Sequence, residues 1–176
     1  MSALPARVAP RPFVLPAVVL GVGLGGFLDG IVLHQLLQWH HMASAVDPPT
    51  SIAALERNTL ADGLFHVAAW AATLAGVVLL WRAAALDGGR PPWGVLTGGL
   101  LVGFAAFNVV EGVVNHLVLG LHHVREGADA FAYDTGFLLV SALLFVAGSA
   151  ILRRAVREPR PRVRVQRHAR TERGGG

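Results

Sequence analysis

Two stretches of the chain place acidic residues and histidines in the same order. Residues 29–41 read DGIVLHQLLQWHH, and residues 111–123 read EGVVNHLVLGLHH. Each copy has an acid followed by a glycine, a histidine four residues after that glycine, and a closing pair of histidines. Imidazole and carboxylate groups can bind metal ions, ligate haem iron or relay protons. These segments are therefore the first candidates for a functional site.

The sequence around these residues is strongly apolar. The 176 residues are 53% hydrophobic and 15% charged, with a mean hydropathy of +0.53, which is typical of an integral membrane protein. Four apolar runs approach or exceed the roughly 20 residues that a helix needs to cross a bilayer; they span residues 13–39, 64–81, 93–121 and 137–152. Ionisable side chains are unfavourable at membrane depth, so their repeated presence indicates a function.

The placement of arginine predicts the orientation. All fifteen cationic residues are arginine, and thirteen lie in the N-terminal segment, in the middle loop (82–90) or from residue 153 onward. A four-span topology puts these three segments on one side, which the positive-inside rule identifies as cytoplasmic. We expect a bacterial inner-membrane protein with a cytoplasmic N-terminus (1–12), a transmembrane domain (13–155) and a disordered, Arg-rich cytoplasmic tail (156–176). The first run is too long for a signal peptide and contains Asp29 and His34.

The spans also repeat as pairs. Asp62-Gly-Leu-Phe at the second span resembles Asp134-Thr-Gly-Phe at the fourth. The predicted fold is therefore all-α, a four-helix transmembrane bundle of two tandem hairpins (about 13–85 and 93–155) related by a pseudo-twofold axis.

The segment 21–26 matches GxGxxG, but no strand precedes it, and small-residue spacing of this kind favours close helix packing over nucleotide binding.

Depth along the helices suggests which histidines act together. The topology directs the repeated polar residues to the outward half of the bundle, and one turn inside Asp62 lies His66. At 1.5 Å per residue, His34, His66 and His116 would share one level, and we predict them to be primary metal ligands. A pattern of 100° per residue puts Asp29 and His34 on different stripes of their helix. The second hairpin has Leu138 at the position that corresponds to His66 in the first, so the two halves of the site are not fully symmetric.

The remaining polar residues receive supporting roles. Asp29 and Glu111 are predicted secondary ligands about one turn deeper. The His-His pairs are predicted to form an outer layer that takes up the metal first, and they comprise His40, His41, His122 and His123. Five side chains are predicted to orient the ligands, namely Gln38, Asn108, Asn115, Asp62 and Asp134. The two aspartates can alternatively be N-terminal helix caps.

Neutral imidazoles with nearby carboxylates suit Zn²⁺, Cu²⁺ or Fe²⁺. The chain has no cysteine, which excludes thiolate sites. An outward-facing transition-metal site for metal handling or delivery is the leading hypothesis. The alternatives are a haem b held by His34 and His116 in a redox protein or enzyme, a proton or ion relay, and a structural membrane subunit.

The quoted motifs carry a family resemblance. DGIVLHQLLQWHHM, a second-span DGLFH and NVVEGVVNHLVLGLHHVRE resemble a bacterial family described only as predicted membrane proteins of unknown function. The likeness covers about residues 13–155 and implies a four-helix membrane fold. The family is also associated with cytochrome oxidase assembly factors that handle copper, which suggests copper.

Four kinds of partner follow from these interpretations. The lipid bilayer is expected to surround the helices, and a metal donor or acceptor protein, or oxidase assembly machinery, is expected at the site. A homodimer is the fourth, because two hairpins are too few to enclose a transport path by themselves. Nucleic acid is not expected, since the basic tail lacks interleaved aromatic residues.

Overall fold

The computed structural model of the chain describes residues 9–87 and 89–157, and the regular structure within these ranges is helical throughout. Four of the helical segments are long and apolar enough to cross a membrane: Arg11–Leu36, Ile52–Asp87, Trp93–Val118 and Ala130–Arg157. The predicted all-α fold with four membrane-spanning helices is therefore confirmed. The pseudo-twofold axis stays a prediction, and the predicted tail lies outside the described residues from position 158 onward.

Two of the four spans change helix type along their length. The first span consists of the short 3-10 helix η1 (Arg11–Phe13), α1 (Val14–Leu28) and the π-helix η2 (Asp29–Leu36). The third span consists of α3 (Trp93–Glu111) and the π-helix η3 (Gly112–Val118). The second and fourth spans are single α-helices, α2 (Ile52–Asp87) and α4 (Ala130–Arg157). The histidine motifs therefore coincide with the two π-helices.

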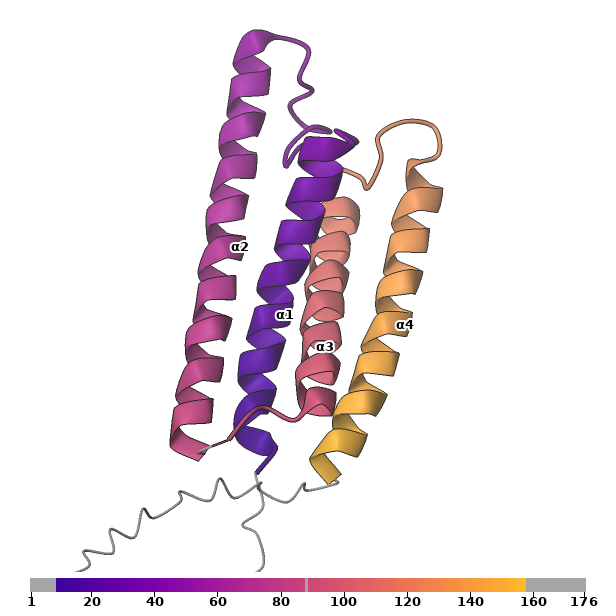
Figure 1. Cartoon of the computed structure of the whole chain (residues 1–176). Coiled ribbons are helices and arrows are strands. Elements are labelled where there is room, and N and C mark those ends of the chain that lie inside the picture. Colours follow the sequence, from indigo (N-terminus) through magenta and orange to yellow (C-terminus); the bar gives the residue numbers. More distant parts are fainter. Residues whose placement is uncertain (1–8, 88, 158–176) are drawn as a thin grey trace, which may run out of the picture.

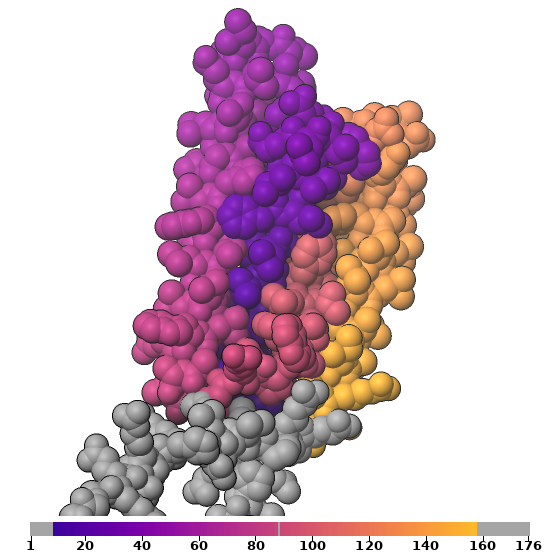
Figure 2. All heavy atoms as spheres, viewed as in Figure 1, coloured from indigo at the N-terminus to yellow at the C-terminus, as the bar shows by residue number. Residues whose placement is uncertain are grey.

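The central contact of the fold is between α1 and α3. Helix α2 packs mainly on α1, and α4 packs mainly on α3 (Figure 1). On the face drawn in Figure 2, atoms of α1 reach the surface between those of α2 and α4. Only 11% of the most apolar window of α2, and 11% of that of α4, is buried. Their outward apolar surfaces are suited to contact lipid.

Helix α2 is longer than the apolar run that predicted it. The run begins at Leu64, but the helix begins at Ile52 and has 36 residues, about 54 Å at 1.5 Å per residue. Its first turns rise above the other helices in Figure 1. Asp62 therefore lies within α2, and Asp134 likewise lies inside α4. The helix-capping alternative for these two aspartates is wrong.

Glycine allows α1 and α3 to approach closely. A Cβ atom built on Gly103 would collide with the backbone of Val18, and one built on Gly21 would collide with the backbone of Leu100. Backbone atoms cannot move aside as a flexible side chain can. The glycine spacing thus determines the distance between the two helices that carry the histidine motifs.

We predict that Gly103→Ala lowers the free energy of unfolding by about 1–3 kcal/mol, the usual effect of overpacking. Thermal unfolding in detergent would measure the change. Gly63→Ala is the matched control, because this glycine lies in α2 and a Cβ added to it would meet no atom within 4 Å. Equal stability of the two variants would contradict the close-packing argument.

Candidate metal centre

The π-helices align each motif's acid with its first histidine. The Leu37 N–H donates to Val32 O at 2.8 Å, and the Leu119 N–H donates to Val114 O at 2.8 Å. Both bonds span five residues, as in a π-helix. Residues five apart therefore lie one above the other, and this is the spacing of Asp29 with His34 and of Glu111 with His116. The 100° pattern had separated Asp29 from His34; that assignment was wrong because the local helix is not α.

A turn after each π-helix brings the chain back toward the site. Gln38 has φ of 50° and Gly120 has φ of 57°, both in the left-handed region. The preceding helices end there, and the next backbone N–H groups donate back across the turn, from Trp39 to Leu33 O at 3.0 Å and from Leu121 to Asn115 O at 2.8 Å. The first histidine of each His-His pair follows directly and points inward.

The first motif forms a buried triad of one carboxylate and two imidazoles. His34 Nε2 lies 3.3 Å from Asp29 Oδ2. One candidate ligand atom from each of Asp29, His34 and His40 lies within 4.8 Å of the others. The Nδ1–H of His40 donates to Val124 O at 2.9 Å, which leaves the Nε2 lone pair of a neutral ring free to ligate.

The second motif forms a matching triad. Glu111 Oε1 lies 3.1 Å from His116 Nε2 and 3.3 Å from His122 Nε2. These three residues also offer ligand atoms within 4.8 Å of one another, and all three are buried. Each triad thus supplies two nitrogen donors and one oxygen donor.

The two triads meet face to face. The rings of His40 and His122 stack with centroids 4.4 Å apart and planes 15° from parallel. The rings of His34 and His122 lie 6.0 Å apart, and those of His40 and His116 lie 6.4 Å apart. We call these six residues, Asp29, His34, His40, Glu111, His116 and His122, the histidine cluster.

Asp62 holds the first triad from outside. His34 Nδ1–H donates to Asp62 Oδ1 at 2.9 Å, and His41 Nδ1–H donates to Asp62 Oδ2 at 2.7 Å. The Met42 backbone N–H also donates to Asp62 Oδ1 at 2.8 Å. A carboxylate on Nδ1 fixes the ring's tautomer and directs Nε2 toward a metal.

Asp134 has the same position beside the second triad. His116 Nδ1 lies 3.1 Å from its Oδ1, and His123 Nδ1–H donates to its Oδ2 at 2.6 Å. The Val124 N–H donates to Asp134 Oδ1 at 2.9 Å. Each aspartate therefore contacts the Nδ1 atoms of two imidazoles, one inside its triad and one in the adjoining loop.

Eight buried nitrogen and oxygen atoms of the cluster lack a well-aligned hydrogen bond. They are His34 Nε2, His40 Nε2, both carboxylate oxygens of Glu111, and both ring nitrogens of His116 and of His122. A buried polar atom without a partner is normally destabilising by about 1–3 kcal/mol. Such atoms converging on one place make the cluster a candidate ligand site.

Burial affects the ionisation of the histidines that follow the turns. Desolvation, and then the nearby His34, lower the pKa of His40 to about 4. Desolvation, and then the nearby His40, also lower the pKa of His122 well below its usual value. Both rings therefore stay neutral at physiological pH, which is the form that can bind a metal.

Two of the predicted assignments differ from the observed positions. Each His-His pair is divided, because His40 and His122 are buried in the cluster whereas His41 and His123 are partly exposed on the orienting aspartates. His66 is not in the cluster. Its Nδ1–H donates to Asp62 O in the same helix at 2.7 Å, and its ring packs against Phe27 and Phe65.

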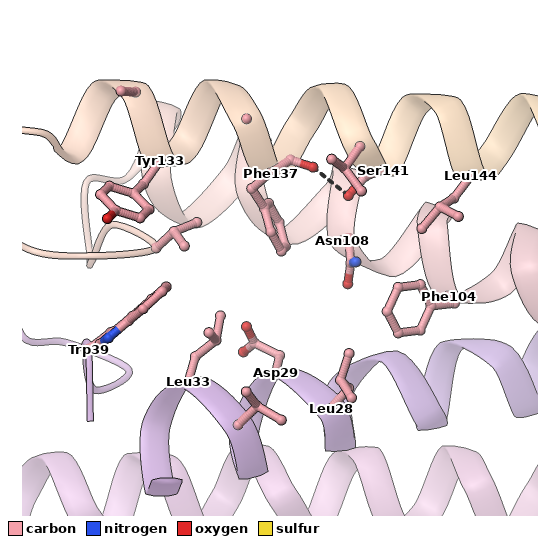
Figure 3. Close-up of a pocket in the computed structure, with 15 residues that line it drawn as sticks. Leu28, Asp29, Leu33, Trp39, Phe104, Asn108, Tyr133, Phe137, Ser141 and Leu144 are labelled. Atoms are coloured by element: carbon pink, nitrogen blue, oxygen red, sulfur yellow. Dashed lines mark hydrogen bonds between the residues drawn. The ribbon is translucent and has the colours of Figure 1, made fainter. Parts of the chain in front are cut away.

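The predicted amides lie at the edges of the cluster. Gln38 is exposed in the turn. Asn115 lines a cavity of about 380 Å³ together with Glu111. Asn108 is buried and lines a larger apolar cavity of about 550 Å³ with Asp29. Figure 3 shows Asn108 and Asp29 projecting into the space between η2 and α4. Each carboxylate of the cluster therefore borders a mostly apolar cavity.

A further cavity lies among the loops at this end of the bundle. Its volume is about 580 Å³, and its lining includes His40, His41, His123 and Glu126. Because it is lined by polar groups and reaches a buried ring of the cluster, it offers a route by which an ion could arrive from the aqueous side.

We predict that His40 in chelator-treated protein titrates near pH 4, well below the ordinary value of about 6.5. The unfolded chain would bind a proton between these values that the folded chain does not, so stability should fall as the pH is lowered through this interval. Histidine ¹⁵N chemical shifts in micelles, assigned with His40→Gln, would measure the titration. Protonation of His40 at pH 6 would contradict its described burial among His34, His116, His122 and Asp29.

Comparisons with known proteins identify the family but add no activity. A family model described as "Predicted membrane protein (DUF2243)" matches residues 16–155. A search of curated proteins found no match. A search of solved structures found none either.

Proposed function

The chain belongs to the DUF2243 family of predicted membrane proteins, and we propose that it binds transition-metal ions in the histidine cluster. The observation that carries this proposal is the convergence on one buried place of eight nitrogen and oxygen atoms that lack a well-aligned hydrogen bond. Lone pairs of neutral imidazoles and carboxylates are ligands for Zn²⁺, Cu²⁺ and Fe²⁺. An ion would give these atoms a better-aligned partner than the contacts within the cluster do.

The ligands in this proposal are the six residues of the cluster, with Asp62 and Asp134 as orienting groups. His34 meets both requirements of a metal-binding histidine, since Nδ1–H is held by Asp62 and Nε2 faces Asp29. His66 is left out because its ring is engaged with its own helix and with phenylalanines. His41 and His123 support the cluster through the aspartates and line the loop cavity.

Metal handling or delivery is the role we infer for this site. The loop cavity gives access from the end of the bundle that the arginine distribution assigns to the outside of the inner membrane. A metal donor or acceptor protein, or the oxidase assembly machinery, would dock at this end. The resemblance described for the sequence suggests Cu²⁺ among the candidate ions.

The alternatives have less support from the geometry. A haem between His34 and His116 needs a flat slot between facing rings, but His40 and His122 occupy this region with ring centroids 4.4–4.9 Å from their neighbours. A proton relay needs carboxylates along the span. In the described ranges, the aspartates and glutamates that are buried all belong to the cluster or orient it.

We expect the purified wild-type protein to contain metal and a His34→Ala, His116→Ala double variant to lose it. Elemental analysis and visible absorption of detergent-purified protein would measure the bound species, and a Soret band would instead indicate haem. His66→Gln is the matched control and should retain the metal. No bound metal in the wild type, even after reconstitution, would contradict the proposal.

Asp62→Asn should weaken metal affinity by about 10–100-fold, the usual effect of losing an orienting carboxylate. An amide cannot present acceptor oxygens to both His34 and His41. Competition with a chromophoric chelator would measure the affinity. The control is Asp47→Asn, which affects an exposed ion pair with Arg57 outside the cluster. Equal affinities in the two variants would count against an orienting role for Asp62.

A further inference from the structure

The histidine cluster contains two complete ligand sets. Asp29, His34 and His40 form one, and Glu111, His116 and His122 form the other. Each set holds its three ligand atoms within 4.8 Å of one another. Ligands on one ion at about 2.0–2.2 Å are separated by roughly this distance or less, so each set can close on an ion of its own with small adjustments.

The stacked rings argue against one shared ion. A metal bonded to an imidazole nitrogen lies close to the plane of the ring, because the lone pair lies in that plane. His40 and His122 are stacked at 4.4 Å with planes only 15° apart. Near-parallel, stacked planes do not meet within a bond length of about 2.1 Å from either ring. The two rings must therefore direct their lone pairs at different ions.

The supporting groups are also duplicated. Asp62 accepts hydrogen bonds from His34 and His41, whereas Asp134 contacts His116 and accepts from His123. Neither aspartate is shared between the two sets in these contacts. Each set thus has its own orienting carboxylate, which is what two separate coordination spheres require.

From these contacts we propose that the cluster is a two-ion centre, with one divalent transition-metal ion in each His₂-carboxylate set and the two ions adjacent across the His40–His122 stack. This inference rests on the proposed metal binding and adds its stoichiometry. Three protein ligands per ion leave at least one coordination position for water or another small ligand. Two such ions side by side could bind one ligand between them.

The test uses the full-length protein in detergent, loaded with Cu²⁺ alone and freed of excess ion. We expect two copper ions per chain by elemental analysis. Because the ions are adjacent, the electron paramagnetic resonance signal should integrate to clearly fewer than two spins per chain, or be broadened by coupling. These measurements on the wild type require no variant to fold.

Two half-site variants provide the second measurement. His34→Ala with His40→Ala, and His116→Ala with His122→Ala, should each retain one copper ion with an ordinary, uncoupled spectrum integrating to one spin. Monodisperse elution would confirm that each variant is folded.

The outcomes separate this inference from the proposed function. One ion in the wild type that is lost from both folded half-site variants would mean a single shared site, which overturns the two-ion centre and leaves metal binding intact. Two ions that give two fully uncoupled spins would also overturn it, since they would not be adjacent. No ion in the wild type would overturn both proposals.

Discussion

The structure depends on how an apolar bundle accommodates ionisable groups in its interior. Two acids and four imidazoles are buried where the first and third spans meet, and several of their atoms have no well-aligned partner. Desolvated polar atoms are tolerated only when other interactions hold them in place. Here the interactions that hold the rings come from outside the cluster. Asp62 in α2 accepts a hydrogen bond from the Nδ1–H of His34, and Asp134 in α4 contacts the Nδ1 of His116.

The rest of the fold brings these groups together. Glycine at the α1–α3 contact lets the two helices approach at backbone distance, and this brings together the ends of the two spans, beyond which the His40 and His122 rings stack. The long helix α2 carries Asp62 to the level where the first loop returns, so that one carboxylate holds a ring in the helix and another in the loop. The close packing of α1 on α3 in the lipid-embedded half thus determines how the side chains of the histidine cluster lie at the loop end.

Much of the fold and part of the site could be predicted from the sequence. Hydropathy predicts the four spans, and the repeated motifs single out His34, His116 and both acids. The roles of His40 and His122 were not predictable from an α-helical pattern, since a π-helix followed by a left-handed residue reverses the chain there. The level assigned to His66 depended on where the second span enters, and α2 begins earlier than its apolar run. A spacing of five between acid and histidine in both copies was the available signal for the π-helices.

A π-turn can be regarded as an α-helix that has gained one residue. The site is therefore encoded by chain length as well as by residue type. Loss of a single residue between Asp29 and His34 would restore the α-helical register and rotate one donor away from the other, although every donor would still be present. A related chain that keeps each acid and histidine but has a one-residue gap in this interval should be regarded as lacking the aligned histidine cluster.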